Sequence, residues 1–287
     1  MAQLIQMRQR IKAIQTIKKI THAMRLISMS MHSRLRAKAP VFETYQNEVT
    51  RMFQKVRLAT PQWTNQTMFP TDAPDKNPLV ILVASQKGLC GNFNSALFRK
   101  FQDLYPEKTL EKTNFVAVGK YAIDFINKQP TDRVVKTFDN FSSARLSLIA
   151  GRIVDLIEQA EKPYSSVVIV ANGLKSFFVQ KPLQTTVLPL SMELSEDTAQ
   201  ELPKEPYAWE QSPTTILDDL AFQYLTSKVH HQLFQSLLAE QAARFISMDN
   251  STRNAKQLLE DTQLLYNKLR QAKITRELTE LSASFQI

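Results

Sequence analysis

The two ends of the chain contain almost none of the residues that disfavour helix interiors. No glycine or proline occurs after Pro213, so the last 74 residues can form one uninterrupted helix, and neither residue precedes Pro40. A helix of that length extends roughly 110 Å at 1.5 Å per residue. Because this exceeds the diameter of a small domain, much of the C-terminal helix must project beyond any core of its own and pack against another helix.

Apolar residues in both end segments recur with alternating steps of three and four, the spacing of a coiled-coil seam. Two helices with one narrow apolar stripe each can bury those stripes against each other, and a domain between them in sequence makes the pair antiparallel. The predicted N-terminal stripe is Leu4, Met7, Ile11, Ile14, Ile17, Ile20, Met24, Ile27 and Met31. The predicted C-terminal stripe is Met248, Thr252, Ala255, Leu259, Thr262, Tyr266 and Leu269, followed after a slip by Ile274, Leu278 and Leu281.

The middle of the chain has a different pattern. Short apolar runs alternate with helix-like stretches, which predicts an α/β domain with a largely parallel, Rossmann-like sheet. The expected strands are 79–85, 115–118, 133–138, 166–171 and 185–190, and the expected helices are 92–104, 121–127 and 143–160. We therefore divide the chain into an N-terminal shaft helix (1–59), a central α/β domain (78–192) and a C-terminal shaft helix (212–287), with linkers at 60–77 and 193–211.

Composition excludes several classes of protein. Hydrophobic residues make up 43% and charged residues 22%, which is typical of folded proteins. The longest apolar run, residues 79–84, is far shorter than the roughly 18 residues that a transmembrane helix needs. One cysteine and four histidines exclude a disulfide framework and leave little for a metal site. We expect no metal and no cofactor.

The net charge of +9 lies entirely in the first forty residues. Nine basic residues precede the first acidic residue, Glu43. Such asymmetry indicates that this segment binds an acidic protein surface, a nucleic acid or a membrane, or that it is a targeting signal. A transit peptide is the weaker interpretation, because the heptad spacing continues past residue 30 and matches a stripe at the far end. Composition does not distinguish between two functions of this basic helix: a shaft that faces acidic protein surfaces, or a segment that binds nucleic acid.

No motif predicts catalysis. The segment Gly88-Leu-Cys-Gly91 follows a strand and precedes a helix, but it matches neither phosphate-loop pattern, so we interpret Gly88 and Gly91 as a tight structural turn. Cys90 has no histidine in the α/β segment to activate it and is expected to be a small buried side chain. The neighbouring His230 and His231 point about 100° apart on a helix and cannot chelate one ion from a single face.

Three blocks of sequence resemble the gamma subunit of F-type ATP synthase. Residues 11–28 are similar to the family's IKxxxxxxKIxxAMxxV stretch, and residues 85–94 to its SDRGLCGxxN turn. The third and most specific block covers 240–255 and 266–281. The chain departs from the pattern at Gln86-Lys87, at Arg276 and in the ending 282–287, as a divergent member of the family would.

The resemblance implies an antiparallel coiled coil of the terminal helices inside a hexamer of alpha and beta subunits, with the α/β domain contacting the epsilon subunit and the membrane ring. It implies a non-catalytic rotor of the central stalk, one copy per complex, which couples ion-driven rotation of the ring to conformational change at the beta subunits. The complex would lie peripherally on the cytoplasmic face of a bacterial inner membrane. The alternative is a basic coiled-coil nucleic-acid-binding protein with an α/β domain. The positions that the resemblance assigns to the shaft–hexamer interface are Lys18, Lys19, Met24, Arg25, Arg270, Gln271, Thr275, Glu277 and Glu280.

Overall fold

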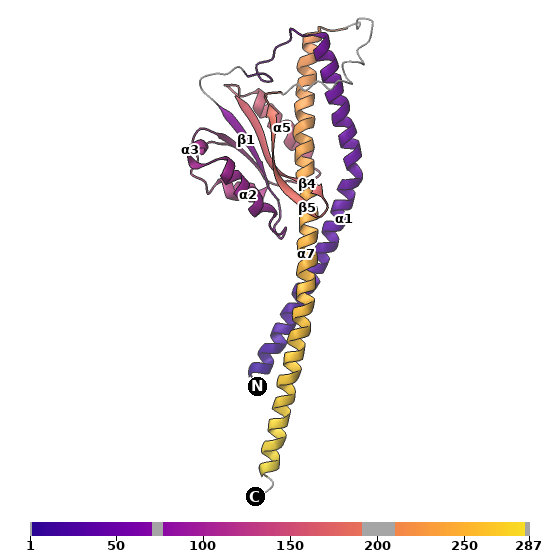
Figure 1. Ribbon diagram of the computed structural model, residues 1–287, viewed down its shortest axis with the longest axis vertical. Helices are drawn as coiled ribbons and strands as arrows, with labels where there is room; N and C mark the ends of the chain where they lie inside the picture. Colours follow the sequence, from indigo (N-terminus) through magenta and orange to yellow (C-terminus); the bar gives the residue numbers. More distant parts are fainter. Residues whose placement is uncertain (1, 71–76, 191–209, 285–287) are drawn as a thin grey trace. The chain divides into compact units, whose positions relative to one another are not determined.

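The computed structural model describes residues 2–70, 77–190 and 210–284, and these residues form two compact units. One unit consists of Met1–Ser30 and Arg244–Ile287, and the other of Met31–Ala243. Two helices contribute to both units: α1 spans Ala2–Ala59 and α7 spans Pro213–Ser284 (Figure 1). The predicted linker 193–211 falls almost entirely outside the described residues.

The larger unit contains a five-stranded sheet in the order β3-β2-β1-β4-β5 (Figure 1). Its strands are β1 (Pro78–Val83), β2 (Asn114–Val118), β3 (Val134–Phe138), β4 (Ser166–Ser176) and β5 (Val179–Leu188). The pairings β3–β2, β2–β1 and β1–β4 are parallel, while β4 and β5 are antiparallel. The helices between the strands are α2 (Phe93–Leu104), α3 (Glu107–Leu110), α4 (Lys120–Ile126) and α5 (Leu146–Glu158). The predicted α/β class with a largely parallel sheet is confirmed.

The last two strands differ from the prediction. The sequence predicted separate strands at 166–171 and 185–190, but β4 continues to Ser176 and β5 begins at Val179. Only Phe177 and Phe178 connect them, so the two strands form a long hairpin. Two-residue hairpin turns usually carry Gly, Asn or Asp, and this one offers no such signal. Pro182 is tolerated because β5 is an edge strand, where one side of the backbone needs no ladder partner.

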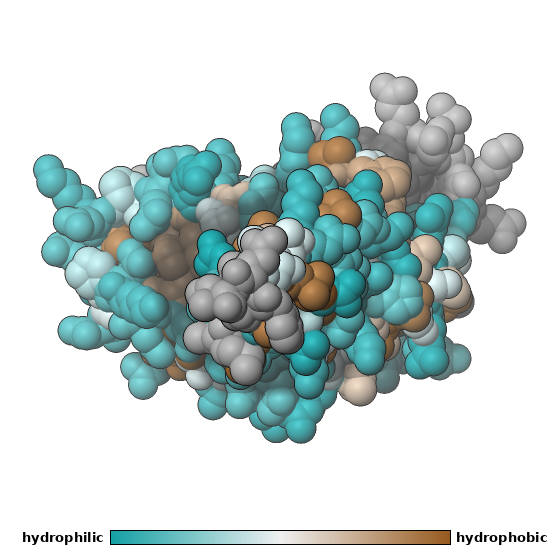
Figure 2. Space-filling view, turned by 90° about the horizontal axis from the view of Figure 1, so that it is seen from below, coloured by the Kyte–Doolittle hydropathy of each residue, from teal (hydrophilic) through white to brown (hydrophobic). Residues whose placement is uncertain are grey.

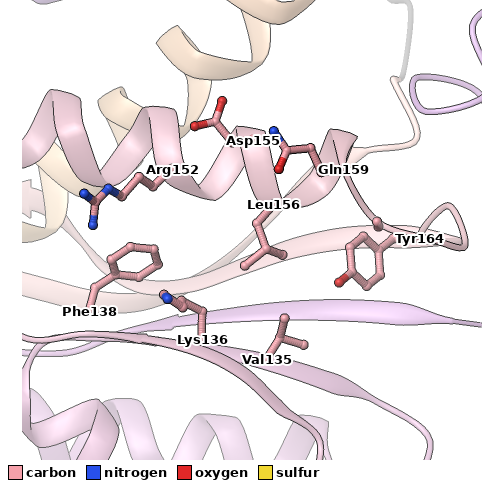
Figure 3. Close-up of a pocket in the computed structure, with 9 residues that line it drawn as sticks. Val135, Lys136, Phe138, Arg152, Asp155, Leu156, Gln159 and Tyr164 are labelled. Carbon is pink, nitrogen blue, oxygen red and sulfur yellow. The ribbon is translucent and has the colours of Figure 1, made fainter.

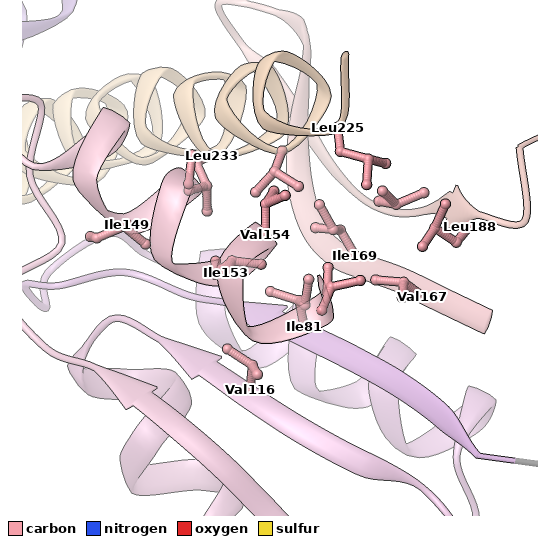
Figure 4. Packing of buried hydrophobic residues seen from close by; sticks show 14 of the residues in the cluster. Ile81, Val116, Ile149, Ile153, Val154, Val167, Ile169, Leu188, Leu225 and Leu233 are labelled. Carbon is pink, nitrogen blue, oxygen red and sulfur yellow. The ribbon is translucent and has the colours of Figure 1, made fainter. Parts of the chain in front are cut away.

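Both faces of the central strand β1 are buried, which explains its continuous apolar sequence. Leu79, Ile81 and Val83 enter one core cluster, whereas Val80 and Leu82 enter a second one. The first cluster contains residues of α5 and α7, including Ile153, Val154, Leu225 and Leu233, as Figure 4 shows. The second contains residues of α2 and α4, including Leu97, Phe101, Ala122 and Ile126. The sheet is thus a middle layer between helices.

Within the larger unit, α1 and α7 also pack against each other. The ring of Phe42 lies 4.7 Å from that of His230 and 4.9 Å from that of Phe234, and Phe53 stacks on Tyr224 at 5.1 Å. The segment after α1 adds Trp63, whose indole Nε1–H donates to Asp218 at 3.0 Å. These contacts join the two long helices to the core of the sheet domain.

Candidate functional site

The smaller unit is an antiparallel pair formed by α1 up to Ser30 and α7 from Arg244. Three side-chain contacts fix the direction: Arg8 with Tyr266, Thr21 with Thr252, and Arg25 with Asp249. As the residue number rises along α1, the number of its partner on α7 falls. The Arg8 Nε–H donates to the Tyr266 hydroxyl at 2.7 Å, and the hydroxyls of Thr21 and Thr252 lie 3.0 Å apart. The predicted antiparallel pairing of the chain ends is confirmed.

The seam on α1 agrees with the apolar spacing at Leu4, Met7, Ile11, Ile14 and Met24, which are buried or half-buried, but not at every predicted position. Ile14 is buried, with 6% of its surface exposed, but Ile17, Ile20 and Ile27 are 53%, 53% and 62% exposed. Those three predicted seam positions are therefore wrong. The buried and half-buried residues of this segment are Leu4, Met7, Ile11, Ile14, Lys18, Thr21, Met24, Arg25 and Ser28.

Small and polar side chains occupy much of this seam. Thr21 and Ser28 are buried on α1, and Met248, Ala255 and Thr262 are buried on α7. Thr21 and Arg25 are bonded across the seam to Thr252 and Asp249, so the side of α1 that carries them faces α7. Ile17, Ile20 and Ile27 lie outside that side. The hydroxyls of Thr21 and Thr262 are satisfied by backbone carbonyls one turn earlier, those of Lys18 and Leu258. The result is a narrow two-helix rod with apolar residues on its outside.

On α7 the predicted seam from Met248 to Leu269 is confirmed, since all seven positions are buried or half-buried. The predicted continuation of the seam beyond Leu269 is wrong, because in the single chain Ile274, Leu278 and Leu281 are 47%, 59% and 55% exposed. The pairing explains the change. Arg8 already lies beside Tyr266, so the antiparallel order brings the start of α1 opposite the residues just past 270. Beyond that point α7 has no facing helix among the described residues of this unit.

Asp249 is the centre of an ion-pair network in the seam. Its Oδ1 accepts a hydrogen bond from Arg25 Nη1 at 2.7 Å, and its Oδ2 lies 3.1 Å from Arg253 Nη2. The side chains of Arg25 and Asp249 are 28% and 26% exposed, so this pair is better shielded than an ordinary surface pair. Arg25 links the two helices and also lies 3.3 Å from His22 Nδ1 through its other Nη.

The sequence-predicted interface residues all lie in this unit. Lys18, Met24 and Arg25 are half-buried, and Lys19 is exposed. On α7 the predicted positions are all exposed in the single chain: Arg270, Gln271, Thr275, Glu277 and Glu280. Glu277 forms an ion pair with Lys273 at 3.3 Å. Sequence reasoning missed the exposed apolar face of α1, because it placed Ile17, Ile20 and Ile27 in the seam.

The turn at 85–91 belongs to the larger unit. Leu89 and Gly91 both have a φ of 62°, a region that favours glycine, and a side chain at position 88 would collide with the Tyr121 hydroxyl. Gln86, one of the divergent positions, braces the turn: its Oε1 accepts hydrogen bonds from the backbone N–H groups of Lys120 and Phe141. The observed backbone is a structural turn of the kind expected, held to its surroundings by a side-chain amide.

The larger unit has cavities among its described residues, and two of them are lined in part by polar side chains. One, of about 450 Å³, lies between β3 and α5 and is lined by Lys136, Phe138, Arg152, Asp155 and their neighbours (Figure 3). It lacks a nucleophile paired with a base. A second, of about 320 Å³, is lined by Phe42, Tyr45, Phe222 and His230 together with Ser147, Thr226 and Ser227. The Ser227 hydroxyl donates its hydrogen bond to the Tyr224 carbonyl and not to His230.

The candidate reactive groups are packing residues. Cys90 is buried beside Phe93, Ala239 and Ala243, as predicted. Burial, with neighbouring His231 as the second cause, lowers the pKa of His230 below its usual value. In the ranges 2–70, 77–190 and 210–284, no cluster of His, Cys, Asp and Glu could hold a metal ion, and none of the helices has the length and apolar character to cross a membrane.

Fold and site together define an α/β protein whose chain ends form an antiparallel two-helix coiled coil carrying an unbalanced positive charge. A family model described as ATP synthase matches residues 3–286. The chain belongs to this family, and its relatives are gamma chains. It is 30% identical to the ATP synthase gamma chain of Paraburkholderia phymatum and 28% identical to that of Acinetobacter baumannii (strain ATCC 17978), in each case over 98% of both chains.

Solved structures share the fold at lower sequence identity. A chain of the Euglena gracilis mitochondrial ATP synthase, in a structure described as OSCP/F1/c-ring, has a TM-score of 0.71 at 18% identity and covers 99% of this chain and 94% of its own. A chain from the Tetrahymena thermophila central stalk and ring has a TM-score of 0.61 at 20% identity, covering 80% and 98%. These similarities show the fold: a mixed sheet domain with two long terminal helices.

Proposed function

We propose that this chain is the central-stalk rotor subunit of an F-type ATP synthase. The antiparallel pairing of its two ends carries the proposal, because a rod made from both termini of one chain can be gripped by other subunits while the domain between them stays attached elsewhere. The similar solved chains support it, since they come from assemblies described as a rotor and as a central stalk with its ring. The rod is formed by the shaft helices 1–59 and 212–287, and the domain by 78–192.

The rod transmits rotation by contact. Each orientation of an asymmetric rod stabilises some conformations of the surrounding subunits over others, which shifts their populations. The isoleucines at 17, 20 and 27 give the rod an apolar surface that can slide without directional bonds, while its basic residues attract acidic partner segments. Exposed ion pairs contribute only about 0–1 kcal/mol each, which suits contacts that must break repeatedly.

The partners in this proposal are the alpha and beta subunits as a hexamer, the epsilon subunit and the membrane ring, with one copy of this chain per complex. ATP chemistry takes place on the beta subunits, and this chain supplies no catalytic group. The complex lies peripherally on the cytoplasmic face of a bacterial inner membrane. Lys18, Lys19, Met24, Arg25, Arg270, Gln271, Thr275, Glu277 and Glu280 contact the hexamer, with Arg25 also holding the rod together through Asp249.

Co-purification tests the proposal. A tagged full-length chain expressed from its native locus is expected to bring down alpha- and beta-type ATPase subunits, and the purified chain alone is expected to hydrolyse no ATP. Absence of those subunits, together with DNA binding that weakens steeply with salt, would instead establish the nucleic-acid alternative.

Substitutions test the contact residues. Alanine at Arg270, Gln271 and Thr275 together is expected to lower ATP-driven rotation of the assembled complex several-fold. The matched control is alanine at Gln257 and Gln263, which are also exposed polar residues of α7 in the same unit. Equal effects of the two sets would remove the assigned residues from the interface.

A further inference from the structure

The cavity between β3 and α5 has a volume of about 450 Å³ and combines cationic, apolar and neutral polar side chains (Figure 3). On the face shown in Figure 2, most side chains are hydrophilic and the hydrophobic ones are scattered, as is ordinary for a protein surface. Pockets for small molecules have volumes of about 300–1,000 Å³ and combine an apolar lining with a few polar groups. The β3–α5 cavity therefore has the size and the mixture of side chains that a small ligand needs.

An irregularity in β3 brings two consecutive residues to the cavity wall. Phe115 of β2 pairs with Val134, and the next residue, Val116, pairs with Lys136. Val135 is therefore the extra residue of a β-bulge. Consecutive residues of a regular strand point to opposite faces, but Val135 and Lys136 both line the cavity. Bulges re-aim side chains and are over-represented at sheet edges and beside active sites, so the bulge adds an apolar side chain next to a cation.

Two cations at the cavity have no anionic partner among the described residues. Lys136 and Arg152 are exposed, and neither forms an ion pair or hydrogen bond with another described residue. Asp155 also lines the cavity, but Figure 3 shows its carboxylate directed away from the space between β3 and α5. Two positive charges and one negative charge leave the wall with a net charge of +1. A monoanion balances that charge, and both cations can bind a carboxylate through charge-assisted hydrogen bonds.

A nearly buried hydroxyl at the cavity also lacks a partner. Tyr164 is only 7% exposed, and its hydroxyl forms no hydrogen bond with another described residue. Burial raises the pKa of Tyr164, so the hydroxyl stays a protonated donor at neutral pH. In Figure 3 this side chain lies at the same end of the cavity as Val135 and Leu156. The charged groups of Lys136 and Arg152 lie toward the other end. The cavity thus has a cationic end and an apolar end with one hydroxyl.

We propose that this cavity binds a small organic acid as its monoanion. The carboxylate lies between Lys136 and Arg152, and the apolar body packs against Val135 and Leu156. An uncharged polar group at the far end of the ligand accepts a hydrogen bond from the Tyr164 hydroxyl. Since both cations are exposed, the ligand enters from solvent at their end. This site goes beyond the proposed function, because it lies in the sheet domain and requires no other subunit.

A titration of the full-length chain with 3-(4-hydroxyphenyl)propionate, followed by ligand-observed NMR, tests the proposal. The probe carries one carboxylate, one apolar ring and one terminal hydroxyl. We expect a Kd below about 1 mM, which is within the range that ligands of this size reach. Lys136→Gln with Arg152→Gln should raise the Kd about tenfold or more. The matched control is Arg99→Gln with Lys100→Gln, which removes two exposed cations from α2 on the other face of the sheet and should leave the Kd unchanged.

The far end of the site is tested separately by Tyr164→Phe. Loss of the hydroxyl should weaken binding of the hydroxylated probe about fivefold. Binding of 3-phenylpropionate, which lacks the terminal hydroxyl, should be almost the same in this variant and in the unmodified chain. A merely structural role of Tyr164 would instead change the binding of both acids equally, and that result would remove the residue from the site.

Several results would overturn the proposal. These are no binding of either acid at about 10 mM, equal binding of the uncharged 3-(4-hydroxyphenyl)propan-1-ol, or equal changes in Kd for the cavity and α2 variants. Tighter binding of phenyl phosphate, which carries a charge of about −1.5 to −2 at neutral pH, would replace the monocarboxylate by a phosphate ligand. Because the titration uses the chain without other subunits, its failure is distinguishable from failure of the co-purification that tests the proposed function.

Discussion

The register of the two-helix unit makes a sharp prediction, because two isoleucines three residues apart lie in opposite environments. Ile14 is 6% exposed in the seam and Ile17 is 53% exposed outside it. Replacing a buried isoleucine by alanine costs about 2–5 kcal/mol, and a two-helix seam that can partly collapse or admit water belongs at the low end. We therefore expect Ile14→Ala to destabilise this unit by about 2 kcal/mol, or about 30-fold in its opening equilibrium. Ile17→Ala should change it by less than about 0.5 kcal/mol.

Amide hydrogen exchange of the full-length chain, resolved by peptide, measures both variants. Peptides from residues 2–30 and 244–284 should exchange about 30-fold faster in Ile14→Ala and almost unchanged in Ile17→Ala. Peptides from β1 and β2 serve as the internal control, because neither isoleucine lies in their unit. If the Ile17 variant loses as much protection as the Ile14 variant, the seam follows the apolar spacing of the sequence and the register described above is incorrect.

Three further predictions concern the ion pair, a buried histidine and a strained glycine. A double-mutant cycle of Arg25→Gln and Asp249→Asn, measured by hydrogen exchange, should give a coupling energy of about 1 kcal/mol. A coupling energy of zero would mean that water replaces the ion pair and that the pair does not stabilise the unit. Burial, with a nearby arginine as the second cause, lowers the pKa of His32 from 6.5, so the unfolded chain binds its proton first as pH falls. Stability should therefore decrease as pH drops below 6.5, and in denaturant titrations at pH 7.5 and 5.5 the decrease should be smaller for His32→Gln. Gly119 has a φ of 89° and its missing Cβ would overlap a backbone carbonyl, so Gly119→Ala should cost about 1–3 kcal/mol or more. A Cβ at Gly151 would have no atom within 4 Å, so Gly151→Ala should stabilise the protein by about 0.5–1 kcal/mol in the same denaturant titrations. Equal changes in stability for the Gly119 and Gly151 variants would contradict this prediction.

In the sheet domain, the local sequence pattern predicted most of the strands but not the hairpin. The strands beginning near 79, 115 and 133 were predicted within one or two residues. The first two are short apolar runs, and the third combines β-branched and aromatic residues with Lys136. The hairpin was missed because Phe177 and Phe178 give no turn signal, and because its outer part pairs strand with strand instead of being buried on both faces. Backbone pairing stabilises that part of the strands, and backbone pairing leaves little trace in side-chain hydropathy.

The sequence by itself determined the length of α7, the antiparallel direction of the two terminal helices and the concentration of positive charge at one end, whereas α1 continues through Pro40 to Ala59. Those properties depend on the absence of glycine and proline, on chain order and on residue counts, none of which requires a partner surface. Tertiary structure alone decided which side of α1 faces α7. Apolar spacing permitted Ile17 and Ile20 in the seam, but the cross-helix contacts of Thr21 with Thr252 and of Arg25 with Asp249 place Lys18, Thr21 and Arg25 there instead. The excluded isoleucines then lie on the surface of the rod, because contacts between the two helices set the register, and apolar spacing along one helix does not report those contacts.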